Sequence, residues 1–148
     1  MINLKEIDST IESDCIALNV AEAQRHLIAP NEKSIEWAKR NASCIPLAIQ
    51  SDANVVGFVM YEPRGNDVFS IHRVMVDAQY QRQGIGRKAM ILTIEQIKNL
   101  GGITIYLSFR PENETARLFF QGLGFVEYEI EPDGEVIYRL GPPRELAF

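Results

Sequence analysis

Two glycines and three cationic side chains stand together in the stretch QRQGIGRK, residues 81–88. The run IHRVMVD, typical of a strand, precedes it, and AMILTIEQIKNL, which has helical spacing, follows it. A helix N-terminus presents unpaired N–H groups and a partial positive charge, and glycine lets the backbone approach a ligand closely. The stretch therefore predicts an anion site, for a phosphate in particular. These eight residues leave one alternative open: a tight turn that the glycines permit, with the cationic side chains simply exposed to solvent.

Two other phosphate-binding motifs do not fit this chain. Gly84–Ala89 matches GxGxxA, but a dinucleotide site also needs an acidic residue at the end of the next strand. That region reads Tyr106–Phe109, and no acidic residue follows until Glu112. No GxxxxGK[ST] motif occurs, so a P-loop is excluded as well.

The bulk composition is that of one globular domain spanning residues 1–148, with 46% apolar residues. A net charge of −5 argues against general nucleic-acid binding. Two cysteines, Cys15 and Cys44, make no disulfide framework, and with His26, His72 and no CxxC or HExxH motif we expect no metal site. No apolar run suggests a signal peptide or membrane span, so we expect a cytoplasmic protein with neither nucleic acid nor membrane as partner.

Apolar spacing and turn residues predict a mixed α/β sheet. Helices are predicted over Ser9–Leu18, Asn31–Asn41, 85–100 and Asn113–Gly122. The capping box Ser9–Glu12 opens the first of them, and a second helical segment is predicted to follow it as far as His26. Strands are predicted over Ile2–Ile7, 45–50, 55–61, Val68–Val76, Ile103–Phe109, Phe125–Ile130 and Glu135–Leu140.

Two ordered motifs carry a family resemblance. Gln81-x-x-Gly84-x-Gly86 resembles the Q/R-x-x-G-x-G/A signature of the GNAT superfamily of acyl-CoA-dependent N-acyltransferases. A second block, NETA from Asn113 followed by FF and GF, is similar to the N-x-x-A…LY…GF pattern of that superfamily. The segments QRHLIAPNEKSIEWA, GFVMYE and IHRVMVDAQYQRQGIGR resemble the diamine (spermine/spermidine) acetyltransferases more loosely.

The resemblance implies a mostly antiparallel sheet of about seven strands with helices on both faces, and acetyl-CoA as co-substrate. By the same resemblance the loop amides cradle the coenzyme A pyrophosphate, one strand hydrogen-bonds the pantetheine arm, and Asn113 holds that arm from the far side. A plain helix N-cap is the alternative for Asn113. The cofactor residues so implied are Val74, Met75, Val76, Gln81, Arg82, Gln83, Gly84, Ile85, Gly86, Arg87, Lys88, Asn113 and Phe120.

The acceptor implied is a small-molecule primary amine, which needs a base or a water relay because it is almost fully protonated at neutral pH. His72 is the candidate base, with Ser70 and Val74 expected on its face of the strand. A histidine at the edge of the core with satisfied nitrogens is the alternative. A backbone N–H near Met75 or Val76 is the candidate oxyanion donor.

Three further residues are candidates for contact with the acceptor. Glu22 and Glu62 could bind a cationic amine or relay its proton, and ordinary surface carboxylates are the alternative. Trp37 could line an acceptor groove, although its helical spacing also suits core packing.

Phe120 departs from the superfamily, which usually has a tyrosine at this position to protonate the departing thiolate. A thiolate can leave without full protonation, so activity is still expected. Tyr106, Tyr128 and Tyr138 are alternative acids.

Three functions stay open: a polyamine N-acetyltransferase, an N-acetyltransferase for an amino acid, antibiotic or protein amine, and an idle acyl-CoA-binding module. A homodimer also stays open.

Overall fold

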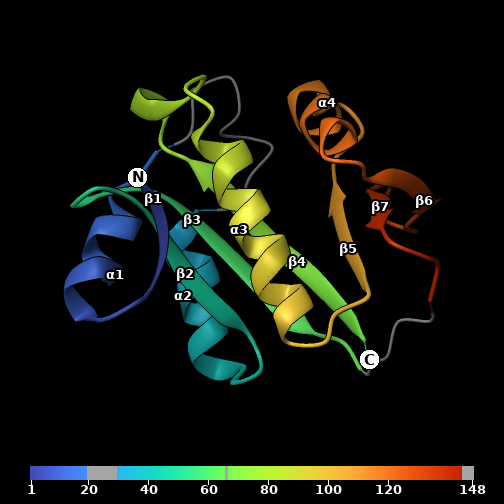
Figure 1. The fold of residues 1–148 in the computed structure, drawn as a ribbon, viewed down its shortest axis with the longest axis horizontal. Coiled ribbons are helices and arrows are strands. Elements are labelled where there is room, and N and C mark those ends of the chain that lie inside the picture. The colour runs from blue at the N-terminus through green and yellow to red at the C-terminus, as the bar shows by residue number, and fades with distance from the viewer. Residues whose placement is uncertain (20–29, 66, 145–148) are drawn as a thin grey trace.

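A single sheet runs through the protein with helices on both of its faces (Figure 1). The computed structural model describes residues 1–19, 30–65 and 67–144. Within these ranges the strands are β1 (Ile2–Glu6), β2 (Ile45–Ser51), β3 (Asn54–Pro63), β4 (Val68–Val76), β5 (Thr104–Phe109), β6 (Val126–Ile130) and β7 (Val136–Leu140). The helices are α1 (Ser9–Ile16), α2 (Asn31–Arg40), α3 (Ile85–Asn99) and α4 (Glu114–Gly122), with a short 3₁₀ helix η2 (Ala78–Tyr80) before α3.

The strands lie in the order β1-β2-β3-β4-β5-β7-β6. All neighbouring pairs are antiparallel except β4 with β5, which is parallel. A parallel pair needs a crossover connection, and α3 supplies it. The predicted fold class, a mixed and mostly antiparallel sheet of seven strands with helices on both faces, is confirmed.

The larger core lies between the sheet and the helices α3 and α4. Ile85, Ala89, Met90 and Ile97 form the buried stripe of α3 at helical spacing. They pack with Phe120 of α4 and with apolar side chains of the strands in one continuous cluster. Because these residues are anchored in the core, they hold the start of α3 in a fixed position relative to the end of β4.

A second core lies on the opposite face, under α1 and α2. Cys15 of α1 and Ile35 of α2 pack there with Phe58 and Met75 from the sheet. The two cores follow the alternation of strand side chains, since Val59 belongs to the first core and Phe58 to the second.

Helix ends differ from the sequence prediction in detail. Asp8 is the N-cap of α1, accepting a hydrogen bond from the Ile11 N–H at 2.8 Å, so the predicted capping box at Ser9 is wrong. Asp and Ser cap about equally well, and here Ser9 is already helical. The predicted helical segment to His26 lies outside the described residues. No helix in the described ranges is long and apolar enough to cross a membrane.

Candidate active site

Strand β4 parts from its neighbour β5 partway along its length. Only Val68–Ser70 of β4 pair with β5, opposite Thr104–Tyr106, whereas β4 continues to Val76. Its other edge stays paired with β3 as far as Val76. Figure 1 shows the two strands diverging toward the end where α3 begins. Part of the β4 backbone after Ser70 therefore has no strand partner on the β5 side among the described strands, and can hydrogen-bond an extended ligand.

A β-bulge in β4 lies at the start of this parting. Met60 of β3 lies opposite Arg73, but the next residue, Tyr61, lies opposite Ile71, so His72 is the extra residue. Bulges bend a strand and redirect its side chains. The bulge therefore accounts for the placement of the consecutive residues His72 and Arg73 on the same side of the sheet.

The bulge also corrects one prediction about the face of the strand. Val74 packs in the core under α3, so it does not share a face with His72. Arg73 instead lies on the α2 side of the sheet, where it donates a hydrogen bond to Asn31 at 3.3 Å. In an uninterrupted strand, consecutive side chains would have pointed to opposite faces. Nothing in the sequence marks the bulge that breaks this alternation.

The loop between β4 and α3 ends in an open helix N-terminus. Gly84 is the N-cap of α3 in the left-handed conformation, with φ of 77°, and no side chain caps the helix. The first hydrogen bond of the helix runs from the Lys88 N–H to the Gly84 carbonyl, so the N–H groups just before it are those that a helix leaves unpaired. Arg82 is also left-handed, with φ of 65°. This geometry forms an anion-binding site, called the anion seat below, at the wide end of the gap between β4 and β5.

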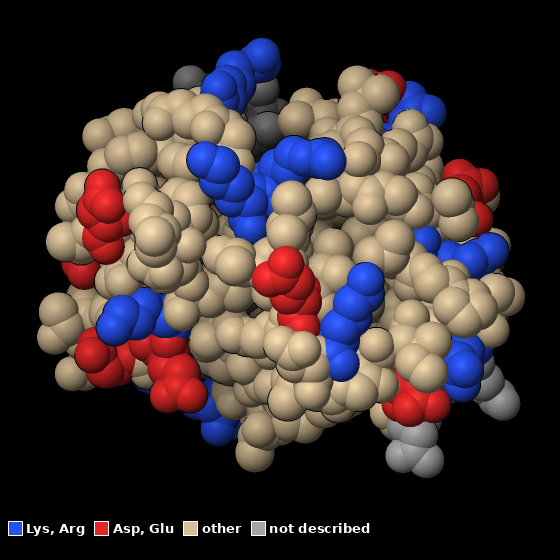
Figure 2. Space-filling view, viewed as in Figure 1, with Lys and Arg blue, Asp and Glu red and all other residues tan. Residues whose placement is uncertain are grey.

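Two side chains of the loop fix its position. The Gln81 side-chain amide donates to the Val76 carbonyl at 2.9 Å, which ties the loop to the end of β4. The Arg87 guanidinium donates to the Gly122 carbonyl at 3.2 Å, which ties the start of α3 to the end of α4. Figure 2 shows Lys and Arg side chains gathered on the surface over this part of the molecule. Arg82, Arg87 and Lys88 are the exposed cations of the loop.

Gly86 lies at the floor of this seat. A Cβ built on it would lie 3.5 Å from Val76 Cγ2 and 3.5 Å from Phe119 Cζ, which is ordinary van der Waals contact. Alanine therefore fits at this position, whereas a longer side chain must turn away from Val76 and Phe119 toward the open helix end.

Asn113 and Phe120 belong to α4 and have structural partners. Asn113 is the N-cap of α4, its side-chain oxygen accepting from the Ala116 N–H at 3.1 Å. The cap uses the side-chain oxygen of Asn113, so its side-chain N–H groups take no part in the cap. Phe120 is buried and stacks on Phe109 with ring centroids 5.7 Å apart. The phenylalanine thus fills part of the core.

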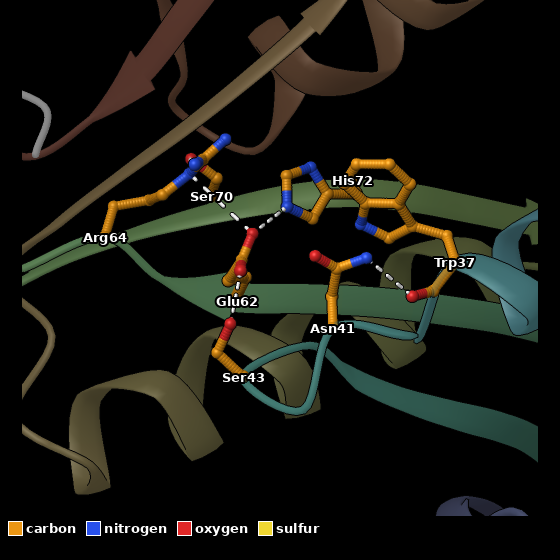
Figure 3. Close-up of polar contacts among 7 residues, drawn as sticks. All are labelled: Trp37, Asn41, Ser43, Glu62, Arg64, Ser70 and His72. Atoms are coloured by element: carbon orange, nitrogen blue, oxygen red, sulfur yellow. Dashed lines mark hydrogen bonds and ion pairs between the residues drawn. The ribbon is translucent and has the colours of Figure 1, made fainter. Parts of the chain in front are cut away.

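Glu62 and His72 meet on the opposite side of the sheet from α3 (Figure 3). Oε1 of Glu62 lies 2.7 Å from Nε2 of His72, and the Ser43 hydroxyl donates to Oε2 at 2.5 Å. Arg64 Nε lies 3.9 Å from Oε1. The carboxylate is therefore held on both oxygens, and the Nδ1 atom of His72 points away from it.

The pKa of Glu62 is lowered by this environment. Burial favours the neutral acid, but the hydrogen bonds from Ser43 and His72, together with the charges of His72 and Arg64, outweigh it. The ionised form of Glu62 is thus the stable one at neutral pH, and it orients the imidazole.

Cys44 and Trp37 border the same group. Burial, followed by the charge of Glu62, raises the pKa of the Cys44 thiol, and a hydrogen bond from Trp37 opposes that rise. Trp37 is 49% exposed, so it is not a core residue. This exposure leaves the role in an acceptor groove open.

Arg73 adds a buried cation on this side of the sheet. Burial lowers its pKa to about 10, so the guanidinium remains charged at neutral pH. Its Nε atom is buried without a hydrogen-bond partner among the described residues.

The structure brings the sequence candidates Glu62 and His72 together and adds three neighbours that the sequence did not point to: Ser43, Cys44 and Arg64. Ser43 and Cys44 precede β2 and Arg64 follows β3, and no local motif marks them; the register of β3 on its neighbours brings Ser43 and Cys44 to Glu62 and Glu62 to His72. Glu22, the other candidate for catalysis and acceptor contact, lies outside the described residues.

A parallel strand pair that parts beside an open helix N-terminus suits an extended ligand with an anionic end. The sequence profile of the acetyltransferase (GNAT) family matches residues 10–125, and the chain belongs to this family. It is an N-acetyltransferase with acetyl-CoA as the acyl donor, as the motifs predicted.

Relatives of the chain include acetyltransferases with two kinds of acceptor. The chain is 27% identical to the spermine/spermidine N(1)-acetyltransferase of Bacillus subtilis, over 92% of this chain and 95% of that one. It is 25% identical to the ribosomal protein bS18-alanine N-acetyltransferase of Haemophilus ducreyi, over 86% and 91%. The PaiA N-acetyltransferase of Thermoplasma acidophilum, solved in complex with coenzyme A, superimposes with a TM-score of 0.76 at 15% identity, over 96% and 99% of the two chains.

The Ser43 hydrogen bond generates a pH-dependent prediction. Because the pKa of Glu62 is depressed in the folded state, its ionisation stabilises the protein above the unfolded value of about 4.3 and this contribution is lost as pH falls through the lower folded value. Ser43→Ala should lower the free energy of unfolding at neutral pH by about 1 kcal/mol. Denaturant unfolding should show the difference shrinking in acid.

The matched control is Ser13→Ala, whose hydroxyl bonds only a backbone carbonyl within α1. It should shift stability equally at neutral and acid pH. A Ser43→Ala effect that stays constant with pH would show that Ser43 does not hold the ionised Glu62.

Proposed function

We propose that this enzyme transfers an acetyl group from acetyl-CoA to a primary amine of a polyamine, with His72 and Glu62 as the proton-accepting pair. The contact that carries the proposal is the 2.7 Å approach of Glu62 to His72 at the point where β4 leaves β5. In this arrangement the amine would approach from the α2 side of the sheet, and the thioester would reach the site from the gap between β4 and β5.

The cofactor would lie along the parted edge of β4. The N–H groups of residues 82–87 would hold the pyrophosphate, supported by the left-handed Gly84 and the uncapped start of α3. Backbone groups of Val74–Val76 would bind the pantetheine arm, and the side-chain N–H groups of Asn113 would contact the arm from α4. A backbone N–H near Met75 would stabilise the oxyanion.

The chemistry begins with the proton of the amine, whose ordinary pKa of about 10.4 leaves it protonated at neutral pH. The Glu62 carboxylate accepts the Nε2–H of His72, which leaves the lone pair on Nδ1. Nδ1 takes the amine proton directly or through a water molecule. The neutral nitrogen attacks the thioester carbonyl carbon, the C–N bond forms, and the C–S bond breaks with the electron pair leaving on sulfur. The second N–H proton, which the nitrogen loses as the amide forms, passes through water to the departing thiolate.

The thiolate would not need a tyrosine acid to leave. Phe120 has no hydroxyl, and the Tyr106 hydroxyl is occupied, donating to the Arg144 carbonyl at 2.6 Å and accepting from the Arg144 N–H at 2.8 Å. The Tyr138 hydroxyl accepts from Gln121 at 3.4 Å, which does not use its proton, so Tyr138 and Tyr128 stay candidate acids. A thiol has a pKa near 8–9, so water is a sufficient proton source.

A second acceptor, the N-terminal amine of a protein, is favoured by the charges beside His72. Arg64 and the buried Arg73 lie on the acceptor side and would repel a polycation. A peptide N-terminus carries a single charge and its carbonyls accept hydrogen bonds from guanidinium groups. The ribosomal alanine acetyltransferase among the relatives fits this alternative.

Other expectations from the sequence stay predictions. They are the role of Glu22, a homodimer, a cytoplasmic location, and the absence of nucleic-acid or membrane partners.

The cofactor placement predicts opposite results for two substitutions at Gly86. Coenzyme A at about 100 times its Kd stabilises the native protein by about 2.7 kcal/mol, which a thermal shift assay detects. Gly86→Glu should abolish the shift, because the added carboxylate turns toward the anion seat. Gly86→Ala should keep it, since the methyl group has room. Equal shifts in wild type and a folded Gly86→Glu would place the cofactor elsewhere.

The acceptor and the base are tested together by thiol release from acetyl-CoA. With spermidine, His72→Gln should reduce kcat by about 10²–10⁴ and leave the KM for acetyl-CoA unchanged. Lys98→Gln, which changes an exposed side chain in the last turn of α3, is the control and should retain activity. Turnover of an alanine-terminated peptide but not of spermidine would replace the polyamine by the protein acceptor. Full activity of His72→Gln on every acceptor would refute the base.

A further inference from the structure

Three side chains with metal-binding atoms converge beside the strand parting. The sulfur of Cys44, a carboxylate oxygen of Glu62 and an imidazole nitrogen of His72 all lie within 4.8 Å of one another. Cys44 directly precedes β2, Glu62 lies on β3 and His72 on β4, so rigid neighbouring strands hold the set. We infer that this Cys44–Glu62–His72 triad binds a divalent ion of the zinc type, with the fourth coordination position open.

The distances and the donor atoms suit this ion. Zinc binds thiolate sulfur at about 2.3 Å and imidazole nitrogen or carboxylate oxygen at about 2.0–2.2 Å, so tetrahedral ligand atoms lie roughly 3.5 Å apart. The three donor atoms lie within 4.8 Å of one another, so a shift of about 1 Å would bring them to that spacing. A mixed set of sulfur, nitrogen and oxygen favours Zn²⁺ or Co²⁺ over Mg²⁺ or Ca²⁺, which take oxygen ligands.

Neighbouring groups already orient two of the ligands. The Ser43 hydroxyl holds Oε2 of Glu62, which leaves Oε1 directed at the space shared with His72. The Trp37 side chain hydrogen-bonds Cys44 and so orients its sulfur, although burial and the charge of Glu62 raise the pKa of the thiol. Such outer partners fix the orientation of metal ligands and raise affinity.

One neighbour opposes the ion. Arg64 Nε lies 3.9 Å from Oε1 of Glu62, and its positive charge repels a dication. Binding also displaces the proton between Glu62 and His72 and releases the thiol proton of Cys44 to solvent. Removing the guanidinium should therefore tighten binding several-fold.

The proposed function adds a consequence. An ion on the triad occupies the Glu62 and His72 atoms that proton transfer uses, so zinc would inhibit acetyl transfer. This consequence rests on the proposed base, whereas the binding itself does not.

The test is a cobalt titration of the protein without acetyl-CoA or acceptor, followed by absorption spectroscopy. Co²⁺ should give a thiolate-to-cobalt charge-transfer band and the strong visible bands of a four-coordinate ion, saturate at one ion per chain, and be displaced by Zn²⁺. Cys44→Ala should lose the charge-transfer band, and Arg64→Gln should lower the Kd several-fold. Cys15→Ala removes the other buried cysteine and should leave the spectrum unchanged.

Circular dichroism confirms that each variant is folded, and Cys44→Ser replaces Cys44→Ala if the alanine variant is not. No charge-transfer band in the wild type, or the same band in the folded Cys44 variant, would overturn the site. Because no acyl donor is present, a negative titration leaves the acetyltransferase assignment intact, and an inactive acetylation assay leaves the titration intact.

Discussion

The limited pairing of β4 with β5 is the constraint on which the rest of the molecule depends. The two strands share three residue pairs and then part, while β4 stays attached to β3 on its other edge. A sheet interior normally satisfies every backbone group, so a parting of this kind leaves backbone donors and acceptors for a ligand. The uncapped start of α3 lies at the wide end of the same parting. One extended ligand with an anionic end therefore finds both of its binding elements in line.

The bulge at His72 links the cofactor side of the sheet to the acceptor side. It places Val74 in the core under α3 and sends His72 to the opposite face, where Glu62 of β3 meets it. Gly57 allows the close approach that follows, since a Cβ there would lie 2.4 Å from the Met75 carbonyl oxygen. A regular strand would have placed His72 and Val74 on the same face of the sheet.

The sequence predicts the elements well because their apolar spacing and turn residues are local. The loop at Gly84–Gly86 was predictable for the same reason, since its glycines and cations are consecutive. The surroundings of His72 were not predictable, because they depend on strand register: pairing between strands brings Ser43 and Cys44 to Glu62, and Glu62 to His72. Trp37 has the spacing of a core residue yet is half exposed, because periodicity cannot tell which stripe of a short helix meets the sheet.

The most direct test of the parted edge as the cofactor site is amide hydrogen exchange with and without acetyl-CoA. An unpaired backbone edge exchanges readily until a ligand bonds to it. Protection should appear at Val74–Val76 and at residues 83–87, with no change at Val68–Ser70, which are already paired with β5. Protection elsewhere in the protein, with the Val74–Val76 amides unchanged, would contradict the account.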